Sequence, residues 1–225
     1  MQQRKTQLDP SAAVLCDELL ARTRGKARCL VAIAGVPGSG KSTLSSLLAE
    51  QLRMRNQSAV VVPMDGFHLT RAQLNATPNP EEAHRRRGAP FTFDAAGLVQ
   101  FVRALRSQTT ILHAPSFDHA AGDPIPGAIA ISPETRFLLL EGIYLHLSLP
   151  PWEEMRSQFD EAWFLDIPLQ AAAARLMRRH VATGVEKTEE KARERVEESD
   201  MVNARAILEN RVSATLEVTV PTELY

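Results

Sequence analysis

The sequence predicts an α/β fold, in which a doubly wound, mostly parallel five-stranded sheet lies between two layers of helices. Short, continuous apolar runs, typical of strands buried on both faces, alternate with segments whose apolar residues recur at helical spacing. One such run, residues 29–35, ends in a glycine-rich turn that leads directly into a helical pattern. Strands that alternate with helices form parallel sheets covered on both faces. We therefore expect a single domain over residues 1–225.

Each expected element has a local signal. The residues Asp-Pro-Ser at 9–11 form a good helix start, so a first helix is expected over 9–24. Asp94 can cap the helix that follows it, and Pro168 suits the first position of another. Residues 70–93 have no clear period and are expected to be irregular, with short helices. The strands expected in the sheet are 29–35, 59–62, 109–115, 136–142 and 161–167, with a last short strand at 216–220; the remaining helices are 41–55, 95–105, 168–184 and 188–209.

The composition is that of an ordinary globular protein, with 44% hydrophobic and 24% charged residues. A net charge of -1 provides no field to recruit nucleic acid or an anionic membrane, and no apolar run approaches the roughly 18 residues of a spanning helix. Residues 1–10 lack the apolar stretch of a secretory signal, and Arg4 and Lys5 alone are weak signs of a mitochondrial presequence. We expect a cytoplasmic protein, with a mitochondrial location left open, that is a monomer or a homodimer.

Residues 35–42, GVPGSGKS, match the phosphate-loop pattern G-x-x-x-x-G-K-[ST] at every position, between an expected strand and an expected helix. Glycines let successive backbone N–H groups point at phosphate oxygens, and the helix N-terminus adds a positive dipole end. Lys41 would reach the β- and γ-phosphates, and Ser42 would ligate Mg²⁺. The expected nucleotide-binding residues are Gly35, Val36, Pro37, Gly38, Ser39, Gly40, Lys41, Ser42 and Thr43.

Asp65 follows the apolar run at 59–62, in the segment MDGFH. Ligands of open α/β sheets sit at the carboxyl ends of the strands, and we expect this strand to lie beside the phosphate-loop strand. Asp65 is therefore the candidate that orients or deprotonates an acceptor hydroxyl, with Gly66 allowing a sharp turn. Phe67 would wall the acceptor pocket, and His68 would orient the carboxylate. The alternative is an aspartate that caps a turn.

Glu141 closes the apolar run 136–142. A charged residue at the end of a buried strand is costly without a partner, which favours a functional role. A carboxylate in this position is the Walker B arrangement, in which it holds Mg²⁺ directly or through water. The expected metal ligands are therefore Ser42 and Glu141.

Arg175, Arg178 and Arg179 lie at positions i, i+3 and i+4 of the helix expected at 168–184, so they share a face. Clustered cations suit a lid, expected over about 175–190, that closes over the triphosphate and stabilises charge on the transferring phosphoryl group. Arg175 and Arg179 are assigned to catalysis and Arg178 to nucleotide binding. The alternative is a solvated basic face.

The acceptor side is expected in two further segments. RRRGAPFTFD, residues 85–94, places Arg86 and Arg87 before aromatic residues, which suits an anionic acceptor; the alternative is a solvated loop with one structural ion pair. Residues 113–133 are rich in Pro and Gly and are expected to form a functional loop. A lone histidine on a strand is more often a packing residue, which weighs against a role for His113. The other residues expected to line the acceptor pocket are His113, Phe117, Asp118 and Tyr144.

Together these segments resemble the P-loop kinase superfamily of uridine kinase, phosphoribulokinase and bacterial pantothenate kinase, most strongly the fungal and bacterial uridine-kinase-like ATP-dependent kinases. The resemblance implies a P-loop NTPase fold, ATP as donor, Mg²⁺, Asp65 as base, Glu141 as the Walker B acid and lid arginines at 175–179. It also implies that Asn203 lies close to adenine. The pyrimidine-binding pattern of uridine kinases is incomplete, so the acceptor does not transfer. The motifs that carry the resemblance are GVPGSGKST, MDGFH, RRRGAPFTFD, APSFDHAAGDP, LLLEGIYL and RLMRRHVATG.

The expected function is transfer of the ATP γ-phosphoryl group to a hydroxyl of a small nucleoside-, sugar- or pantothenate-like metabolite. The N-K-x-D motif of a GTP switch and the L-S-G-G-Q-like signature of an ABC-type ATPase are absent from the sequence. The alternative is a P-loop ATPase with a regulatory or assembly role and no small-molecule acceptor. A kinase acting on a macromolecule is a third possibility, disfavoured by the short chain and the lack of a basic nucleic-acid face.

Overall fold

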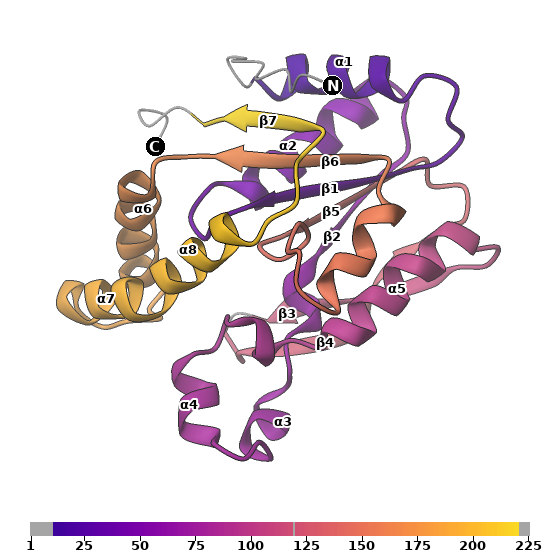
Figure 1. Ribbon diagram of the computed structural model, residues 1–225. Helices are drawn as coiled ribbons and strands as arrows, with labels where there is room; N and C mark the ends of the chain where they lie inside the picture. The colour runs from indigo at the N-terminus through magenta and orange to yellow at the C-terminus, as the bar shows by residue number, and fades with distance from the viewer. Residues whose placement is uncertain (1–10, 119, 221–225) are drawn as a thin grey trace.

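The computed structural model describes residues 11–118 and 120–220. Its centre is a five-stranded parallel sheet with strand order β2-β5-β1-β6-β7 (Figure 1). This confirms the predicted fold class; the start of the first helix at residues 9 and 10 lies outside the described residues. The strands of the sheet are β1 (Cys29–Gly35), β2 (Ala59–Pro63), β5 (Phe137–Gly142), β6 (Glu161–Asp166) and β7 (Leu216–Thr219).

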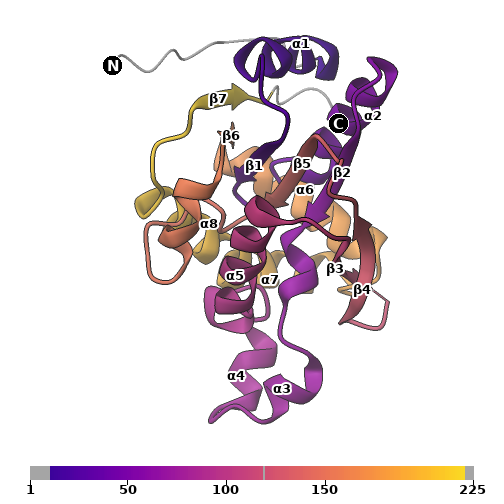
Figure 2. The ribbon, with the colours of Figure 1, turned by 90° about the vertical axis from the view of Figure 1, so that its right-hand side faces the viewer.

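Helices cover both faces of this sheet, as Figures 1 and 2 show. Side chains of β1 alternate between two separate hydrophobic clusters, since successive residues of a strand point to opposite faces. Cys29, Val31 and Ile33 pack with α1 (Ala12–Arg22) and α2 (Lys41–Met54). The intervening residues pack with the helices of the other face. Those helices are α5 (Ala95–Ser107), α6 (Leu169–Ala182) and α8 (Met201–Glu209).

The predicted strand 109–115 was wrongly assigned to the sheet. It forms β3 (Leu112–Asp118), which pairs with β4 (Asp123–Ile131) in a separate antiparallel sheet, and β7 supplies the fifth strand of the main sheet instead. Only Ala114 is buried in β3, whereas every residue of β1 is buried. Proline residues in both hairpin strands remove ladder donors, which restricts such strands to sheet edges. The segment predicted as a functional loop is therefore largely a hairpin.

The prediction that β1 and β2 are adjacent strands is also wrong, because β5 lies between them. All six residues of β5 are buried, whereas Val60, Val61 and Pro63 of β2 are partly exposed. A strand with two buried faces takes a central place in a parallel sheet, and the partly exposed strand takes the edge. Asp65 therefore lies beyond a strand that borders β5 rather than the phosphate-loop strand.

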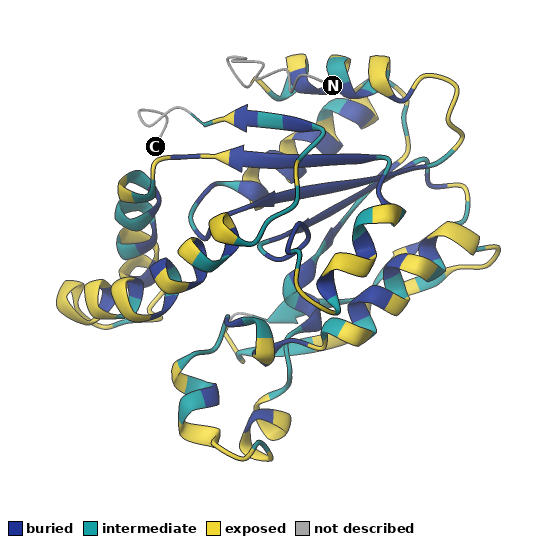
Figure 3. Ribbon diagram, in the orientation of Figure 1, coloured by how far each residue is buried: buried dark blue, intermediate teal, exposed yellow. Residues whose placement is uncertain are grey.

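The predicted irregular region 70–93 contains short helices, as expected. Figure 3 shows the central strands of the main sheet buried and these helices largely exposed. The helix predicted at 188–209 is interrupted by a π-helical turn. The short elements are η1 (Met64–Phe67), α3 (Arg71–Asn75), α4 (Pro80–Arg85), η2 (Pro90–Thr92), η3 (Trp152–Gln158), α7 (Glu189–Arg195) and the π-turn η4 (Val196–Asp200). Among residues 11–118 and 120–220, no helix is long and apolar enough to cross a membrane.

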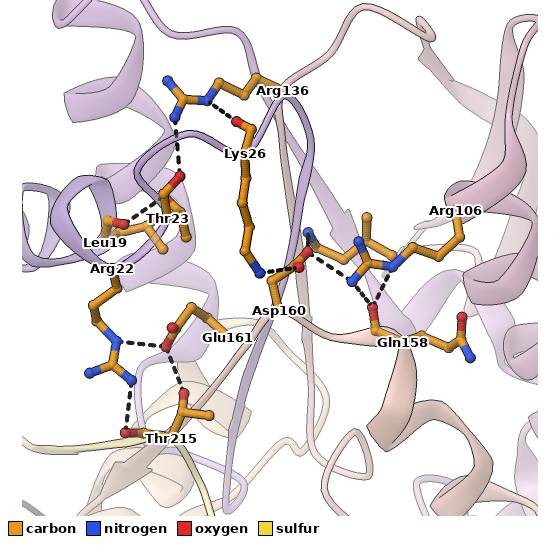
Figure 4. Close-up of polar contacts among 11 residues, drawn as sticks. Leu19, Arg22, Thr23, Lys26, Arg106, Arg136, Gln158, Asp160, Glu161 and Thr215 are labelled. Carbon is orange, nitrogen blue, oxygen red and sulfur yellow. Dashed lines mark hydrogen bonds and ion pairs between the residues drawn. The ribbon is translucent and has the colours of Figure 1, made fainter.

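A polar network fixes the amino ends of the strands, opposite the phosphate loop (Figure 4). The carboxylate of Asp160 accepts bonds from the Leu30 N–H at 2.9 Å, Lys26 Nζ at 2.7 Å and Arg106 Nη2 at 2.8 Å. Beside it, Glu161 accepts from Arg22 Nε at 2.8 Å. Burial would raise the pKa of Asp160, but these donors outweigh it and hold the pKa below its usual value.

Asp160→Asn is expected to lower the free energy of unfolding by about 2 kcal/mol at pH 7, because the donors lose a charged acceptor. Since the folded-state pKa is lowered, the stabilisation is present above the unfolded value of about 3.9 and is lost as pH falls through the folded value. Urea denaturation at pH 7 and pH 3 measures this, and the difference from wild type should shrink at pH 3. Asp17→Asn, at an exposed pair with Arg55, should cost less than about 0.5 kcal/mol. Equal losses in both variants would contradict the assigned role.

His146 is a second buried polar group, 1% exposed, and within the described residues neither ring nitrogen has a hydrogen-bond partner. Burial, reinforced by Arg156 and Arg211, lowers its pKa to about 3. In the unfolded chain His146 therefore binds a proton as pH falls below about 6.5, whereas in the folded protein it stays neutral until a much lower pH. Stability is retained above about pH 6.5 and is lost as pH falls towards 3, by up to about 1.4 kcal/mol per pH unit.

His146→Leu is expected to reduce this pH dependence, since leucine cannot be protonated in the unfolded chain. Urea midpoints of wild type and variant at pH 7 and pH 5 provide the measurement. The variant should lose less stability than wild type between the two values. Parallel losses in the two proteins would show that His146 is not the group responsible.

Candidate active site

The phosphate loop connects β1 to α2 and leaves the helix N-terminus open. Gly40 is the N-cap of α2, with φ of 92°, and no side chain caps this end. Lys41 is 8% exposed, and its Nζ donates to the Val36 carbonyl at 3.0 Å. Burial lowers the pKa of Lys41 to about 8, although Glu141 and Asp65 act in the opposite direction. Open amides and a poorly neutralised lysine fit a polyanionic phosphate group.

Gly38 brings the loop against α6. Its φ is 78°, and a Cβ there would lie 2.6 Å from the Ala172 carbonyl oxygen and 2.9 Å from Leu176 Cγ. No other residue type satisfies both the left-handed backbone and this contact without displacement. The loop and the expected lid helix are therefore packed directly on one another.

Ser42 and Glu141 form an oxygen-rich pair at the carboxyl end of β5. The Ser42 hydroxyl donates to Glu141 Oε1 at 2.9 Å, and Glu141 is 7% exposed. Burial raises the pKa of Glu141, while Lys41 opposes the rise. A hydroxyl and a carboxylate suit Mg²⁺, which commonly takes few protein ligands and completes its shell with phosphates and water. The structure brings the two predicted ligands together, and their role in holding Mg²⁺ stays a prediction.

A pocket of about 340 Å³ joins the phosphate loop to α6. Both the loop residues Lys41 and Ser42 and the predicted lid arginines line it, so the arginines face the loop as their helical spacing predicted. Leu176 lies among them and was not predicted; it supplies an apolar wall. The lining residues are Gly38, Gly40, Lys41, Ser42, Thr43, Arg175, Leu176, Arg178 and Arg179.

Asp65 lies in η1, just beyond β2, rather than at the end of the strand itself. Its carboxylate is 45% exposed, and its charge acts on both Lys41 and Glu141. The sheet register explains this, because Pro63 of β2 pairs with Glu141 of β5. Asp65 therefore reaches the same edge as the phosphate loop through β5, not through a direct strand neighbour.

The surroundings of Asp65 are aromatic and tightly packed. His68 Nδ1 lies 2.9 Å from the Asp65 carbonyl oxygen and 4.0 Å from Asp65 Oδ1. The His68 ring lies 3.9 Å from that of Phe93 and 4.9 Å from that of Phe117. Gly66 lies in the tight turn η1 and has no positive φ; glycine is required there by close approach, since a Cβ would collide with the Pro115 carbonyl of β3. Phe67 is buried in the core and packs on Phe101.

The arginines at 85–87 point to different partners. Arg85 binds Glu82 and lies 3.6 Å from Glu198. Arg86 Nη2 donates to Asn203 Oδ1 at 3.4 Å, and within the described residues no carboxylate lies within ion-pair distance of Arg86. Arg87 donates to the Leu69 carbonyl at 2.9 Å, lies 3.7 Å from Asp123 and sits over the Phe117 ring. Arg85 and Arg87 thus have structural partners, and Arg86 is the member best suited to receive an anion.

The remaining predicted residues lie farther from the phosphate pocket. His113 is exposed, with Nδ1 3.2 Å from the Gly127 carbonyl across the hairpin. Asp118 caps the turn by accepting from the Ala120 N–H at 2.8 Å. Tyr144 is buried, and its hydroxyl donates to the Gly88 carbonyl at 2.7 Å. Asn203 is 4% exposed and is absent from the lining of the pocket among described residues, so its predicted place near adenine stays a prediction.

The fold and this site define a nucleotide-binding P-loop protein of the kinase class. Residues 30–204 match the model of the Phosphoribulokinase / Uridine kinase family. The chain belongs to this family, and the resemblance predicted from its motifs is confirmed.

Individual relatives support the same assignment. A Schizosaccharomyces pombe protein named "putative uridine kinase" is 40% identical over 214 residues, covering 92% of this chain and 91% of the relative. An "ATP-dependent kinase-like protein" of Aspergillus versicolor is 45% identical over 153 residues, covering 66% of this chain and 89% of the relative. The crystal structure of a "putative fructose transport system kinase" from Silicibacter sp. TM1040 has a TM-score of 0.83 at 38% identity, covering 94% of this chain and 99% of that one.

Gly38→Ala is expected to weaken ATP binding at least tenfold, because the new methyl group pushes the phosphate loop away from α6. Gly25→Ala is a matched control, since Gly25 also has positive φ, 80°, but meets no atom within 4 Å. Both substitutions incur a backbone cost of about 1–2 kcal/mol. Only Gly38→Ala should change the dissociation constant of a fluorescent ATP analogue. An unchanged constant in Gly38→Ala would refute the contact's role in binding.

Proposed function

We propose that the protein is an ATP-dependent kinase that transfers the γ-phosphoryl group to a hydroxyl of a small metabolite. One observation carries the proposal: Asp65 lies at the same sheet edge as the phosphate loop, close enough for its charge to act on Lys41 and Glu141. A nucleotide-binding switch needs the loop, but it does not need a half-exposed carboxylate beside it. A hydroxyl acceptor does need such a group.

The donor side holds the triphosphate. The loop amides and Lys41 would bind the β- and γ-phosphates, and Ser42 and Glu141 would hold Mg²⁺, which neutralises charge on the phosphate oxygens. Phosphate next to Lys41 favours the charged ammonium that burial disfavours. Arg175 and Arg179 would stabilise the transferring group, and Arg178 would contact the nucleotide, because all three line the same pocket.

The acceptor side would be the space beside Asp65. In this proposal Asp65 accepts or orients the proton of the attacking hydroxyl. The rings of His68 and Phe117 offer a flat apolar wall, and Arg86 offers a cation without a carboxylate partner among described residues. The relatives' names point to different acceptors, a nucleoside in one and a sugar in another. They support a small hydroxyl compound as a class and do not select one.

Asp65→Asn is expected to lower acceptor-dependent ADP formation by about 10²–10⁴-fold, with ATP affinity unchanged, because the variant keeps the shape but cannot accept the proton. The measurement is ADP release with Mg-ATP across nucleosides, pantothenate, glycerate, sugars and sugar phosphates. Asp166→Asn is the matched control, since Asp166 is exposed at the carboxyl end of β6, on the same sheet edge. It should retain turnover.

The panel also decides between the proposal and the rival ATPase. Stimulation by one acceptor, lost in Asp65→Asn, supports a small-molecule kinase and names the substrate class. Equal, slow hydrolysis in wild type and Asp65→Asn, with no acceptor effect, favours a regulatory ATPase. Full acceptor-dependent turnover in Asp65→Asn removes Asp65 from the mechanism.

A further inference from the structure

The helix that follows the lid changes its hydrogen-bond pattern at residues 196–200. Between α7 and α8 the backbone forms the π-turn η4, and the Met201 N–H bonds the Val196 carbonyl, five residues earlier. Such turns displace the following side chains from their α-helical positions and recur at functional sites. Asp200 is the last residue of the turn and is partly buried, and Asn203, three residues later, is buried. Their side chains bond to different parts of the fold.

Asp200 holds the lid helix. Its Oδ2 lies 2.8 Å from His180 Nε2, and His180 is 6% exposed in the last turn of α6. The residue before it is Arg179, one of the arginines that line the phosphate pocket. The Glu186 N–H bonds the His180 carbonyl at 3.0 Å, which closes the turn after the helix. The carboxyl end of α6 is therefore tied to η4 through a part-buried side-chain contact.

Asn203 contacts a different segment from Asp200, namely the loop that follows α4. Its Oδ1 accepts from Arg86 Nη2 at 3.4 Å. Gly88, with φ of 108°, lies next to the Asn203 amide, and the Gly88 carbonyl is fixed by the Tyr144 hydroxyl. The nearby contact of Arg85 with Glu198 joins two exposed side chains and adds little. Asn203 is thus the buried attachment point of this loop on α8.

The same loop supports the segment that carries Asp65. The Leu69 N–H donates to the Thr92 carbonyl at 2.9 Å, and the Asp94 N–H donates to the Phe67 carbonyl at 2.8 Å. Both bonds lie at the carboxyl end of η1, the element that carries Asp65, so residues 86–94 support its backbone. Figure 1 shows α7 and α8 leading from α6 back towards the sheet, above the α3–α4 segment.

We propose that Asp200 and Asn203 are positioning residues that couple the lid over the phosphate pocket to the loop supporting Asp65. Asp200 sets the end of α6, Asn203 sets residues 86–94, and the π-turn places the two side chains where each can reach its partner. The inference rests on the proposed function in one respect, since it takes the Asp65 side as the acceptor side. The contact itself is independent of which acceptor is used.

Hydrogen exchange measured by mass spectrometry tests the coupling without an acceptor. In wild type, Mg-ATP should slow exchange in residues 175–182 and also, at least twofold, in residues 86–94. In Asn203→Leu the first effect should remain and the second should disappear. Asn203→Asp, which keeps an acceptor for Arg86, should restore it. Arg205→Ala, on an exposed position of the same helix, should behave as wild type.

Asp200→Leu provides the complementary measurement. It should speed exchange at 175–182 and weaken binding of a fluorescent ATP analogue about tenfold, whereas Arg86→Met, which breaks the bond to Asn203 from the other side, should leave that binding within twofold. If Asn203→Leu does not fold, Arg86→Met removes the same bond from the other side and should give the same exchange pattern. Uniformly faster exchange across the domain in Asn203→Leu, or nucleotide protection of 86–94 equal to wild type, would overturn the proposal. Coupled protection together with a flat acceptor panel would leave the coupling standing and reject the kinase assignment alone.

Discussion

The register of β5 between β1 and β2 is the constraint on which the rest of the site depends. Glu141 pairs with Ile33 on one side and with Pro63 on the other. Two residues after Ile33 the chain enters the phosphate loop, and two residues after Pro63 it reaches Asp65. A slip of one residue would turn Glu141 to the other face of the sheet and separate it from Ser42. One set of backbone bonds therefore aligns the loop, the candidate metal ligands and the candidate base.

Burial then gives this edge its chemistry. Lys41 and Glu141 are both almost fully buried, and burial shifts the pKa of each towards its neutral form. Each also favours the charged form of the other, so the pair is partly self-compensating. A triphosphate and a divalent cation bring the missing charges to both groups at once. Polyanion and metal are thus expected to bind together more strongly than either alone, since each relieves the desolvation cost of the residue it faces.

The sequence predicted what depends on local spacing and missed what depends on distant pairing. The phosphate loop, Glu141 and the shared face of Arg175, Arg178 and Arg179 follow from short patterns. The structure brings the loop and the arginines to one pocket, and Glu141 accepts a hydrogen bond from Ser42 of the loop. The place of β5 and the separate β3–β4 hairpin depend on which strands compete for the centre of the sheet, which no local pattern encodes. Contacts between segments far apart in the chain also decide which side chains pair. They give Arg86 and Arg87 different partners and bring His180 to Asp200.

Donor and acceptor sides are therefore built in different ways. The donor side stands on sheet ends and the first turn of α2, where each side chain is fixed by strand pairing or helix geometry. The proposed acceptor side would be assembled from η1, residues 86–94 and the β3–β4 hairpin, which meet through long-range contacts such as Leu69 with Thr92. Changes in these three segments would alter the proposed acceptor pocket without disturbing the strand register that aligns the phosphate loop. The proposed link through Asn203, which is buried and bonded to Arg86, would keep the two sides aligned when the acceptor side changes.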